Sequence, residues 1–262
     1  MASAWNLSGA VKLARAAEML NELRREIVAF HASTPYRLIA EKEAGSGDHV
    51  VRVQIRNSPP IRWGALIGDA IHNLRSALDL LVWQLVLHNG ATPGKKNSFP
   101  VFDHENDFLA GYAAQLNGTA ASVAQRIKGI APFEKGNVTL WLLHRLDIID
   151  KHRVLLPAYS SVGTTIIDMS VGLRGAADWT KDVPPMPIGL NWATPSCPVR
   201  DGEELWRVRA DALDKVDLNP KFTFTVALAP GTPVKLGTPV VELLDGFSKE
   251  VTRVVETFPE VV

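Results

Sequence analysis

Arg145 and His152 are the residues of this chain whose types and spacing most suggest chemistry. They are seven positions apart in the stretch from Trp141 to Arg153, so in an α-helix their side chains lie within about 20° of each other. Three apolar residues share that sector: Val138, Trp141 and Ile149. The pair is therefore predicted to point into the apolar side of a helix. The solvent-exposed face is predicted to carry His144, Asp147 and Lys151.

A second polar set lies upstream, on one side of another predicted helix: Asp69, His72, Asn73, Ser76 and Asp79. Placing an arginine and an imidazole against an apolar core costs free energy unless each has a hydrogen-bonding or charged partner or takes part in a reaction. A polar pocket formed by the two helices would suit phosphodiester cleavage without a metal ion. In such a reaction histidine moves a proton near neutral pH, and arginine holds the phosphate through two parallel hydrogen bonds.

The same residues allow two other interpretations. In the first, they form a buried structural network in which Asp69 or Asp79 neutralises Arg145, because structural ion pairs imitate active sites. In the second, the acidic and polar side chains of the upstream set bind a metal ion together with a histidine from the neighbouring helix. The chain contains neither the Glu-x-x-His pairs of di-iron bundles nor a His-Glu-x-x-His motif. No metal ligand and no cofactor is therefore assigned.

An arginine followed after six residues by a histidine, near the end of a helix in a bundle, resembles the motif of the higher eukaryotes and prokaryotes nucleotide-binding (HEPN) superfamily. Many of its members are metal-independent ribonucleases of toxin and phage-defence systems, and they usually act as dimers. The resemblance covers residues 60 to 157 and implies that Arg145 and His152 are the catalytic pair. The family usually has Asn, Asp or His directly after the arginine, where this chain has Leu146.

Two shorter stretches, Gly68 to Asp79 and Asp150 to Arg153, also resemble uncharacterised proteins of actinobacteria and their phages. This second resemblance implies no activity. Beside the pair, Asp69, His72 and Asp79 are predicted to form a supporting set.

Helices and one hairpin are predicted for the first part of the chain. Apolar residues at three- and four-residue steps predict helices over 8–31 and from the Asn57-Ser58-Pro59-Pro60 start signal to about His88. Shorter helices are predicted over 104–116 and 120–130, and Asn137 is predicted to cap the helix that carries Arg145 and ends before Pro157. A β-hairpin is predicted from segments 36–42 and 50–56 around Gly45-Ser46-Gly47-Asp48.

The second part of the chain has a residue pattern that favours strands and loops. Alternating residues predict strands over 164–173, 203–209 and 222–228, and the Pro-, Gly- and Trp-rich run 176–202 is predicted to be a long loop. Thr238-Pro239 opens a final helix. Its predicted core stripe is Val240, Leu244, Phe247, Val251, Val254 and Phe258.

The long helix before His88 has two further features. Gly64 and Gly68 each cost about 1 kcal/mol relative to alanine in a helix, which favours close packing against them or a ragged first turn. Beyond Asp79 the helix becomes apolar nearly all round through Leu80, Trp83 and Leu87. Such a helix is predicted to be buried in a bundle or in a subunit interface.

Composition excludes several classes of protein. The net charge is zero, so binding of nucleic acid would depend on a local patch. Cys197 is the only cysteine, which excludes an internal disulfide and favours a reducing compartment. The chain shows no signal-peptide pattern and no apolar run long enough for a membrane span. A cytoplasmic protein without a membrane partner is expected.

Together these patterns predict an α+β fold: a helical bundle of about four main helices with an N-terminal β-hairpin, a C-terminal antiparallel β segment and a closing helix. Residues 1–262 are predicted to form one integrated domain, with a helical core at about 8–157 and a β-rich segment with the final helix at about 158–262.

The leading functional hypothesis is a HEPN-like, metal-independent endoribonuclease or RNA-interacting protein that acts as a homodimer. The alternative is a non-catalytic phage or bacterial protein that binds a host protein through its Trp- and Pro-rich surface. That surface would include Trp179, Trp192 and Trp206. The hairpin also has a cationic face with Arg37, Arg52 and Arg56. These arginines could bind a phosphate backbone, but the simpler interpretation is that they are exposed to solvent and bind nothing.

Overall fold

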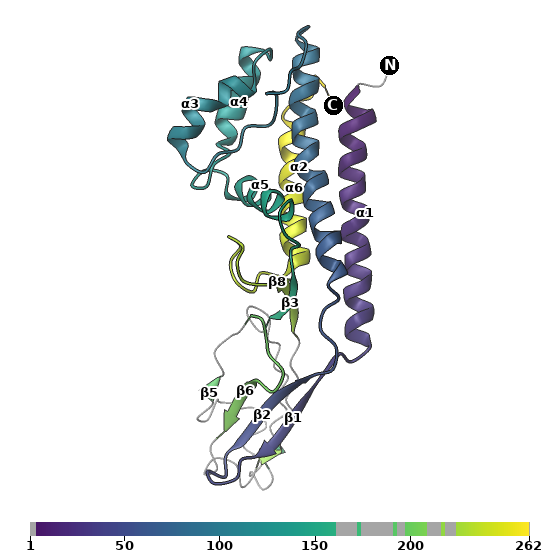
Figure 1. Ribbon diagram of the computed structural model, residues 1–262, viewed down its shortest axis with the longest axis vertical. Helices are drawn as coiled ribbons and strands as arrows, with labels where there is room; N and C mark the ends of the chain where they lie inside the picture. Colours follow the sequence, from purple (N-terminus) through teal and green to yellow (C-terminus); the bar gives the residue numbers. More distant parts are fainter. Residues whose placement is uncertain are drawn as a thin grey trace.

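Three long helices lie side by side along the length of the molecule (Figure 1). They are α1 (Ala4–Ala32), α2 (Arg62–His88) and α6 (Val240–Glu256). This computed structural model describes residues 4–160, 172–173, 191–192, 197–208, 216–217 and 224–261. The β-hairpin that connects α1 to α2 lies at one end of the molecule, so these two helices run antiparallel.

Each of these helices buries an apolar stripe, as the three- and four-residue spacing of its apolar residues predicts. The stripe of α2 is at most 2% exposed and consists of Ile67, Ile71, Leu74, Leu78, Leu81 and Leu85. The predicted stripe of α6 is at most 1% exposed and includes Phe258, which lies just beyond the helix. In α1, Ala16, Leu20 and Leu23 are buried, while Leu13, Ile27 and Phe30 pack against the core at its edge. Burial of these stripes is the main attraction between the helices.

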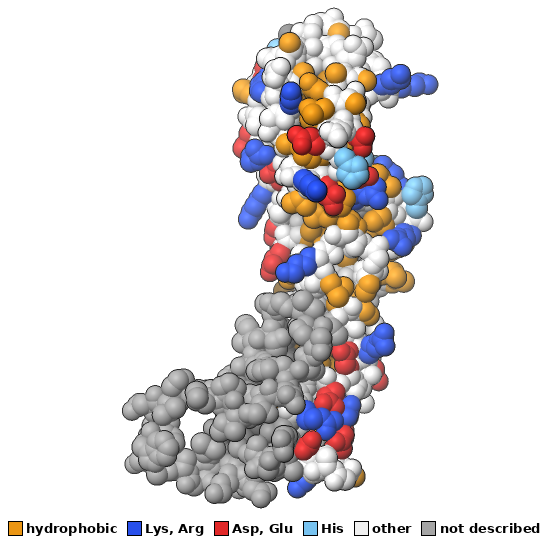
Figure 2. All heavy atoms as spheres, turned by 90° about the vertical axis from the view of Figure 1, so that its left-hand side faces the viewer, with side chains coloured by type: hydrophobic (Ala, Val, Ile, Leu, Met, Phe, Trp, Pro, Cys, Tyr) orange, Lys and Arg blue, Asp and Glu red, His pale blue; other side chains and the backbone are white. Residues whose placement is uncertain are grey.

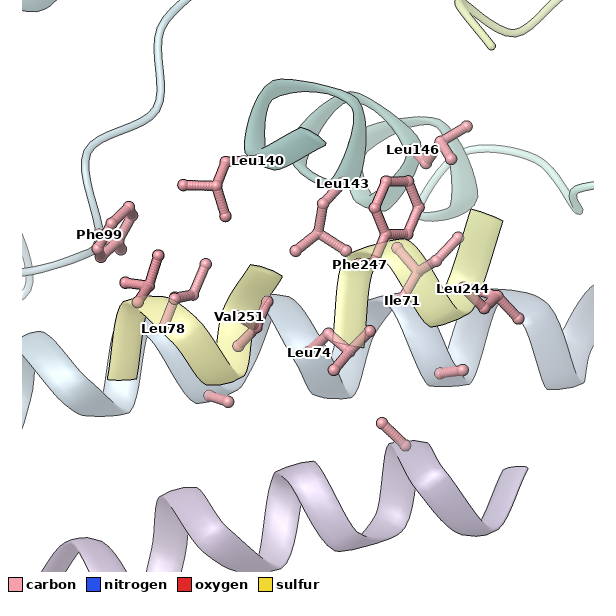
Figure 3. Packing of buried hydrophobic residues seen from close by; sticks show 14 of the residues in the cluster. Ile71, Leu74, Leu78, Phe99, Leu140, Leu143, Leu146, Leu244, Phe247 and Val251 are labelled. Atoms are coloured by element: carbon pink, nitrogen blue, oxygen red, sulfur yellow. The ribbon is translucent and has the colours of Figure 1, made fainter. Parts of the chain in front are cut away.

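The short helix α5 (Val138–Asp150) crosses the bundle and closes the core from one side. Its predicted cap is confirmed, because the Asn137 side chain accepts a hydrogen bond from the Leu140 backbone N–H at 3.2 Å. Figure 3 shows the core that α5 covers, where Leu143 and Leu146 face Phe247 of α6 and Ile71 of α2.

Helices α3 (Glu105–Gln115) and α4 (Ala121–Ile130) form a side layer near one end of the bundle (Figure 1). Arg126 of α4 ties this layer to the end of the chain. It donates to the Thr257 carbonyl oxygen at 2.7 Å, pairs with the Glu260 carboxylate and lies 4.6 Å from the centre of the Phe258 ring.

The strands in the described part of the chain form three antiparallel sheets. In the largest, β1 (Tyr36–Lys42), β2 (His49–Ile55), β6 (Glu204–Val208) and β5 (Asn191–Trp192) lie in the order β1-β2-β6-β5. In the second, β3 (Pro157–Ser160) pairs with β8 (Thr225–Leu228), and in the third β4 (Gly172–Leu173) pairs with β7 (Val216–Asp217). Aromatic rings join α1 to two strands: Phe30 lies 6.2 Å from Tyr159 of β3, and the Tyr159 ring lies 5.6 Å from Tyr36 of β1.

The α+β class, the helices, the hairpin and the final helix are confirmed. The later strands β6 and β5 extend the hairpin sheet, with β6 paired to β2 and β5 paired to β6, whereas β3 and β8 form a separate sheet. Strand β3 was not predicted, because its four residues show no clear alternation. The predicted strand 164–173 and loop 176–202 fall mostly outside the described residues, although β5 is a strand within the latter range.

None of the described helices is long and apolar enough to span a membrane.

Candidate active site between α2 and α5

The rotation of α5 about its axis differs from the predicted one. Its inward stripe is at most 1% exposed and consists of Leu140, Leu143 and Leu146, whereas Val138 is 50% exposed. Asp147, which was predicted to face solvent, is also buried. The predicted inward position of Arg145 and His152 is therefore wrong. The helix has two apolar sectors, and the leucine sector, rather than the one with Trp141 and Ile149, fills the core.

The buried Asp147 carboxylate is the centre of a polar cluster between α2 and α5. Its side chain is 3% exposed. Oδ1 lies 3.0 Å from Nδ1 of His72 on α2, and Oδ2 accepts a 2.6 Å hydrogen bond from Lys151 Nζ, one helical turn further along. A buried carboxylate is stable only when it is paired. His72 and Lys151 supply that pairing from the surface.

The imidazole of His72 connects this carboxylate to a hydroxyl. Its Nε2 lies 3.3 Å from Ser76 Oγ, four residues further along α2. A carboxylate can only accept hydrogen bonds, so in the contact with Asp147 the donor must be Nδ1. This favours the tautomer of His72 with its proton on Nδ1. Nε2 is then the basic nitrogen. Because the side chain of His72 is 52% exposed, a dissolved reactant can approach this nitrogen.

A second carboxylate lies beside the cluster because a glycine leaves room for it. A Cβ atom at Gly68 would clash with the carboxylate oxygens of Asp150. Burial, with Asp69 and Asp147 nearby, raises the pKa of Asp150 above its usual value. Gly64 is similar, since a Cβ there would lie 2.5 Å from the Leu155 carbonyl oxygen. The close packing predicted at both glycines is confirmed.

Further along the same junction, Arg75 holds a structural network. It is 7% exposed, and it donates to the Phe99 carbonyl oxygen at 2.8 Å and to His144 Nδ1 at 3.3 Å. Asp79 lies 2.8 Å from the Arg75 guanidinium and accepts from the Phe99 backbone N–H at 2.9 Å. Because Arg75 and Asp79 form an ion pair and both bond to the Phe99 backbone, they fix the Phe99 segment against α2.

The predicted site residues are thus only partly brought together. His72 lies in the cluster around Asp147, and exposed Asp69 is near Asp150. Asp79 belongs to the Arg75 network. Arg145 was predicted to meet them but lies two residues before Asp147, about 160° away around the helix.

Arg145 and His152 occupy other surroundings. The side chain of Arg145 is 40% exposed, and its Nη1 lies 3.7 Å from Asp103 Oδ2. Trp141 donates to the other oxygen of Asp103 at 2.7 Å. His152 is exposed in the turn that follows α5, and its backbone N–H donates to the Ile149 carbonyl oxygen.

The roles of Asp147, Asp150 and Lys151 were not predicted from the sequence. Two signals pointed to them: Asp147 and Lys151 are four residues apart on one helix, as are His72 and Ser76 on the other. Gly68, also four residues before His72, marks where a neighbour approaches closely. Among the described residues, no group of three or more His, Cys, Asp or Glu side chains is arranged to hold a metal ion.

Two other predicted surfaces look different in the structure. Arg52 of the hairpin lies 3.2 Å from Glu41 and 3.3 Å from Glu204, so its charge is already balanced. Trp206 is 2% exposed, and Trp179 lies outside the described residues. Figure 2 shows basic and acidic side chains interspersed on one face of the molecule, and they also occur together near the hairpin end.

Comparison with protein-family models, with curated proteins and with solved structures finds no match for this chain. The HEPN-like relationship inferred from Arg145 and His152 therefore stays a prediction.

The contact between Gly68 and Asp150 can be tested by a double-mutant cycle. In the wild-type background, Gly68→Ala should lower the free energy of unfolding because Asp150 must move away. In an Asp150→Ala background, the same change should be neutral or stabilising by up to about 1 kcal/mol, the helix preference for alanine. Urea denaturation of the four proteins gives the coupling. Gly129→Ala on α4, where a Cβ meets nothing within 4 Å, is the matched control. Equal effects of Gly68→Ala in both backgrounds would contradict the contact.

His144 should make stability depend on pH. Burial, with the charge of Arg75, lowers the pKa of His144 from 6.5 to about 4. Between these values the unfolded chain binds a proton that the folded chain does not bind, so the free energy of unfolding should fall as pH is lowered from about 6.5 to about 4. The expected loss is on the order of 2 kcal/mol.

Urea denaturation at pH 7 and pH 4.5 measures this loss. His144→Gln keeps a hydrogen-bond acceptor but does not titrate, so it should lose less stability than the wild type over the same interval. Parallel losses in the two proteins would show that the imidazole is not the group responsible.

Proposed function

We propose that this protein is a metal-independent, HEPN-like ribonuclease in which His72, oriented by Asp147, takes the proton from the attacking hydroxyl. The observation that carries the proposal is the 3.0 Å contact between His72 Nδ1 and the buried Asp147 carboxylate. It supports a defined tautomer with a basic and accessible Nε2. General bases in enzymes need a fixed orientation of this kind within reach of the reacting proton.

In the proposed reaction, Nε2 of His72 accepts the proton of an RNA 2′-hydroxyl as that oxygen attacks the adjacent phosphorus. The P–O5′ bond breaks, and the products are a 2′,3′-cyclic phosphate and a 5′-hydroxyl end. His152 donates the proton that the leaving 5′ oxygen takes up. Lys151, beside Asp147, offsets the negative charge that develops on the phosphate oxygens, while Arg145, on another side of α5, binds a different phosphate along the RNA chain. The exposed position of His72 suits a polymeric substrate.

The biological setting included in this proposal is a cytoplasmic toxin or phage-defence system, in keeping with the HEPN-like motif. The alternative predicted from the sequence is a non-catalytic protein that binds a host protein through its Trp- and Pro-rich surface. One of the tryptophans expected on that surface is not available for binding. Trp206, which would have been part of that surface, is buried.

Cleavage of mixed RNA in excess EDTA tests the proposed reaction. The wild type should cleave, and His72→Ala and Asp147→Asn should each lower the rate by about 100-fold or more, the usual contribution of a general base. The matched control is His104→Ala, which removes an exposed imidazole before α3. Arg145→Ala and His152→Ala should also lose activity. The variants of the more exposed side chains, His72, His104, Arg145 and His152, should keep their melting temperatures within a few degrees.

A wild-type protein that leaves RNA intact would refute the ribonuclease proposal. Wild-type rates in His72→Ala would refute the role of the α2–α5 cluster. A large fall in melting temperature for Asp147→Asn, without any cleavage by the wild type, would make the cluster structural.

The proposal also includes a homodimer, and an exposed apolar stripe on α2 supports it. Leu80, Trp83 and Leu87 follow one another at helical spacing on one face, and Trp83 and Leu87 are 41% and 46% exposed. The helix was predicted to be buried on this side. Within the described residues the stripe is only partly covered, which favours coverage by another subunit.

Replacement of Trp83 by serine should therefore weaken the dimer. In sedimentation equilibrium the wild type is expected at twice the monomer mass and Trp83→Ser near the monomer mass at the same concentration. Val28→Ser, which changes a 70% exposed residue on α1, should leave the mass unchanged. A monomeric wild type, or a dimer that tolerates Trp83→Ser, would exclude this interface.

A further inference from the structure

We propose that Ser76 is a nucleophile that His72 and Asp147 activate toward activated carboxylic esters, so that its hydroxyl becomes acylated. This inference uses the same His72–Asp147 pair as the proposed ribonuclease but concerns a different reaction, and it does not depend on RNA. The three side chains form one hydrogen-bonded series. Ser76 Oγ lies 3.3 Å from His72 Nε2, and His72 Nδ1 lies 3.0 Å from Asp147 Oδ1.

The positions of the protons favour this direction of transfer. With the Nδ1 proton directed at Asp147, Nε2 carries a lone pair, and the nearby hydroxyl of Ser76 can donate to it. A carboxylate, an imidazole and a hydroxyl in this order form the arrangement that activates serine in several unrelated hydrolase folds. It is recognised by its geometry rather than by sequence positions. Lys151 holds the far oxygen of Asp147 at 2.6 Å, which restricts rotation of the carboxylate.

Helix geometry explains why the serine meets the imidazole. Residues four apart on a helix are neighbours on its surface, and Ser76 follows His72 by four positions in the middle of α2. A serine in a helix often donates to the carbonyl oxygen four residues back. Here the group that Oγ reaches on that residue is a ring nitrogen.

The proposed step conserves atoms and charge. Ser76 Oγ forms a bond to the carbonyl carbon of the ester while its proton moves to His72 Nε2. The bond between that carbon and the leaving oxygen then breaks, and the leaving group departs as an alcohol with the proton from Nε2, or as a stable phenolate. The products are an O-acyl serine and the released alcohol or phenol. Neither an oxidant nor a further reactant is needed.

The surroundings of Ser76 determine which esters react. The backbone N–H groups in the interior of α2 are used in the helix, so they are not free to stabilise the oxyanion that develops on the carbonyl oxygen. Acylation should therefore require a good leaving group, and removal of the acyl group by water should be slow. The expected behaviour is one acylation per chain followed by little turnover.

p-Nitrophenyl acetate is the probe for this reaction. The intact wild-type protein should release close to one equivalent of p-nitrophenolate and gain one acetyl group, which peptide mass spectrometry should locate on Ser76. Ser76→Ala should abolish that labelled peptide. His72→Gln and Asp147→Asn, checked for an unchanged melting temperature, should slow acetylation of Ser76 by about 100-fold or more.

Two variants are matched controls for this experiment. Ser248→Ala removes a partly buried helical serine that has Leu244, not histidine, four residues before it. His104→Ala removes an exposed imidazole away from α2. Both should behave like the wild type. Acetylation only of lysines, or equal acetylation of Ser76 in wild type and His72→Gln, would overturn the proposal.

The two proposals fail in different ways. If Ser76 is acetylated but RNA stays intact, the serine nucleophile stands and the ribonuclease is refuted. If RNA is cleaved and Ser76 does not react with the ester, the ribonuclease stands and the nucleophile is refuted.

Discussion

A single buried carboxylate sets how the helices of this protein meet. Asp147 has almost no contact with solvent, and an ionised side chain in that position must find opposite charge or hydrogen-bond donors. His72 lies on α2 and Lys151 directly after α5, so the carboxylate is satisfied only when α5 presents one particular side to α2. Apolar packing alone would allow more than one rotation of α5, because its apolar residues occupy two sectors. The polar contacts select between them.

The rest of the core supports this arrangement. The α5 leucines pack on α2 and α6, as Figure 3 shows for Leu143 and its neighbours. Gly64 and Gly68 let the chain from Asp150 to Leu155 lie directly against α2. Close helix approach at small residues and a buried polar cluster therefore occur at the same junction. That junction holds Ser76, His72 and Asp147 together through contacts between α2 and α5.

Much of the fold could be predicted because long helices with one apolar stripe leave little ambiguity. The stripe of α6 was identified residue by residue, and the turn residues from Gly45 to Asp48 identified the hairpin. The face of α5 could not be read in the same way. Its periodicity fits two orientations, and the assumption that charged residues face solvent fails at Asp147. His72 on α2 could be found because it belongs to the polar side of a predicted helix. Asp147 on α5 could not, because its role depends on contact with a residue distant in the sequence.

The position of α6 also has a consequence for the order in which the chain can fold. Phe247 and Val251 fill the space between α2 and α5, yet they belong to the last element of the chain. While the protein is being synthesised, Ile71 and Leu143 lack the part of their cover that α6 provides until this final helix has left the ribosome. Exposed surface of this kind promotes aggregation. A chain interrupted before residue 240 would keep those faces exposed, so proteases and chaperones should recognise truncated copies efficiently.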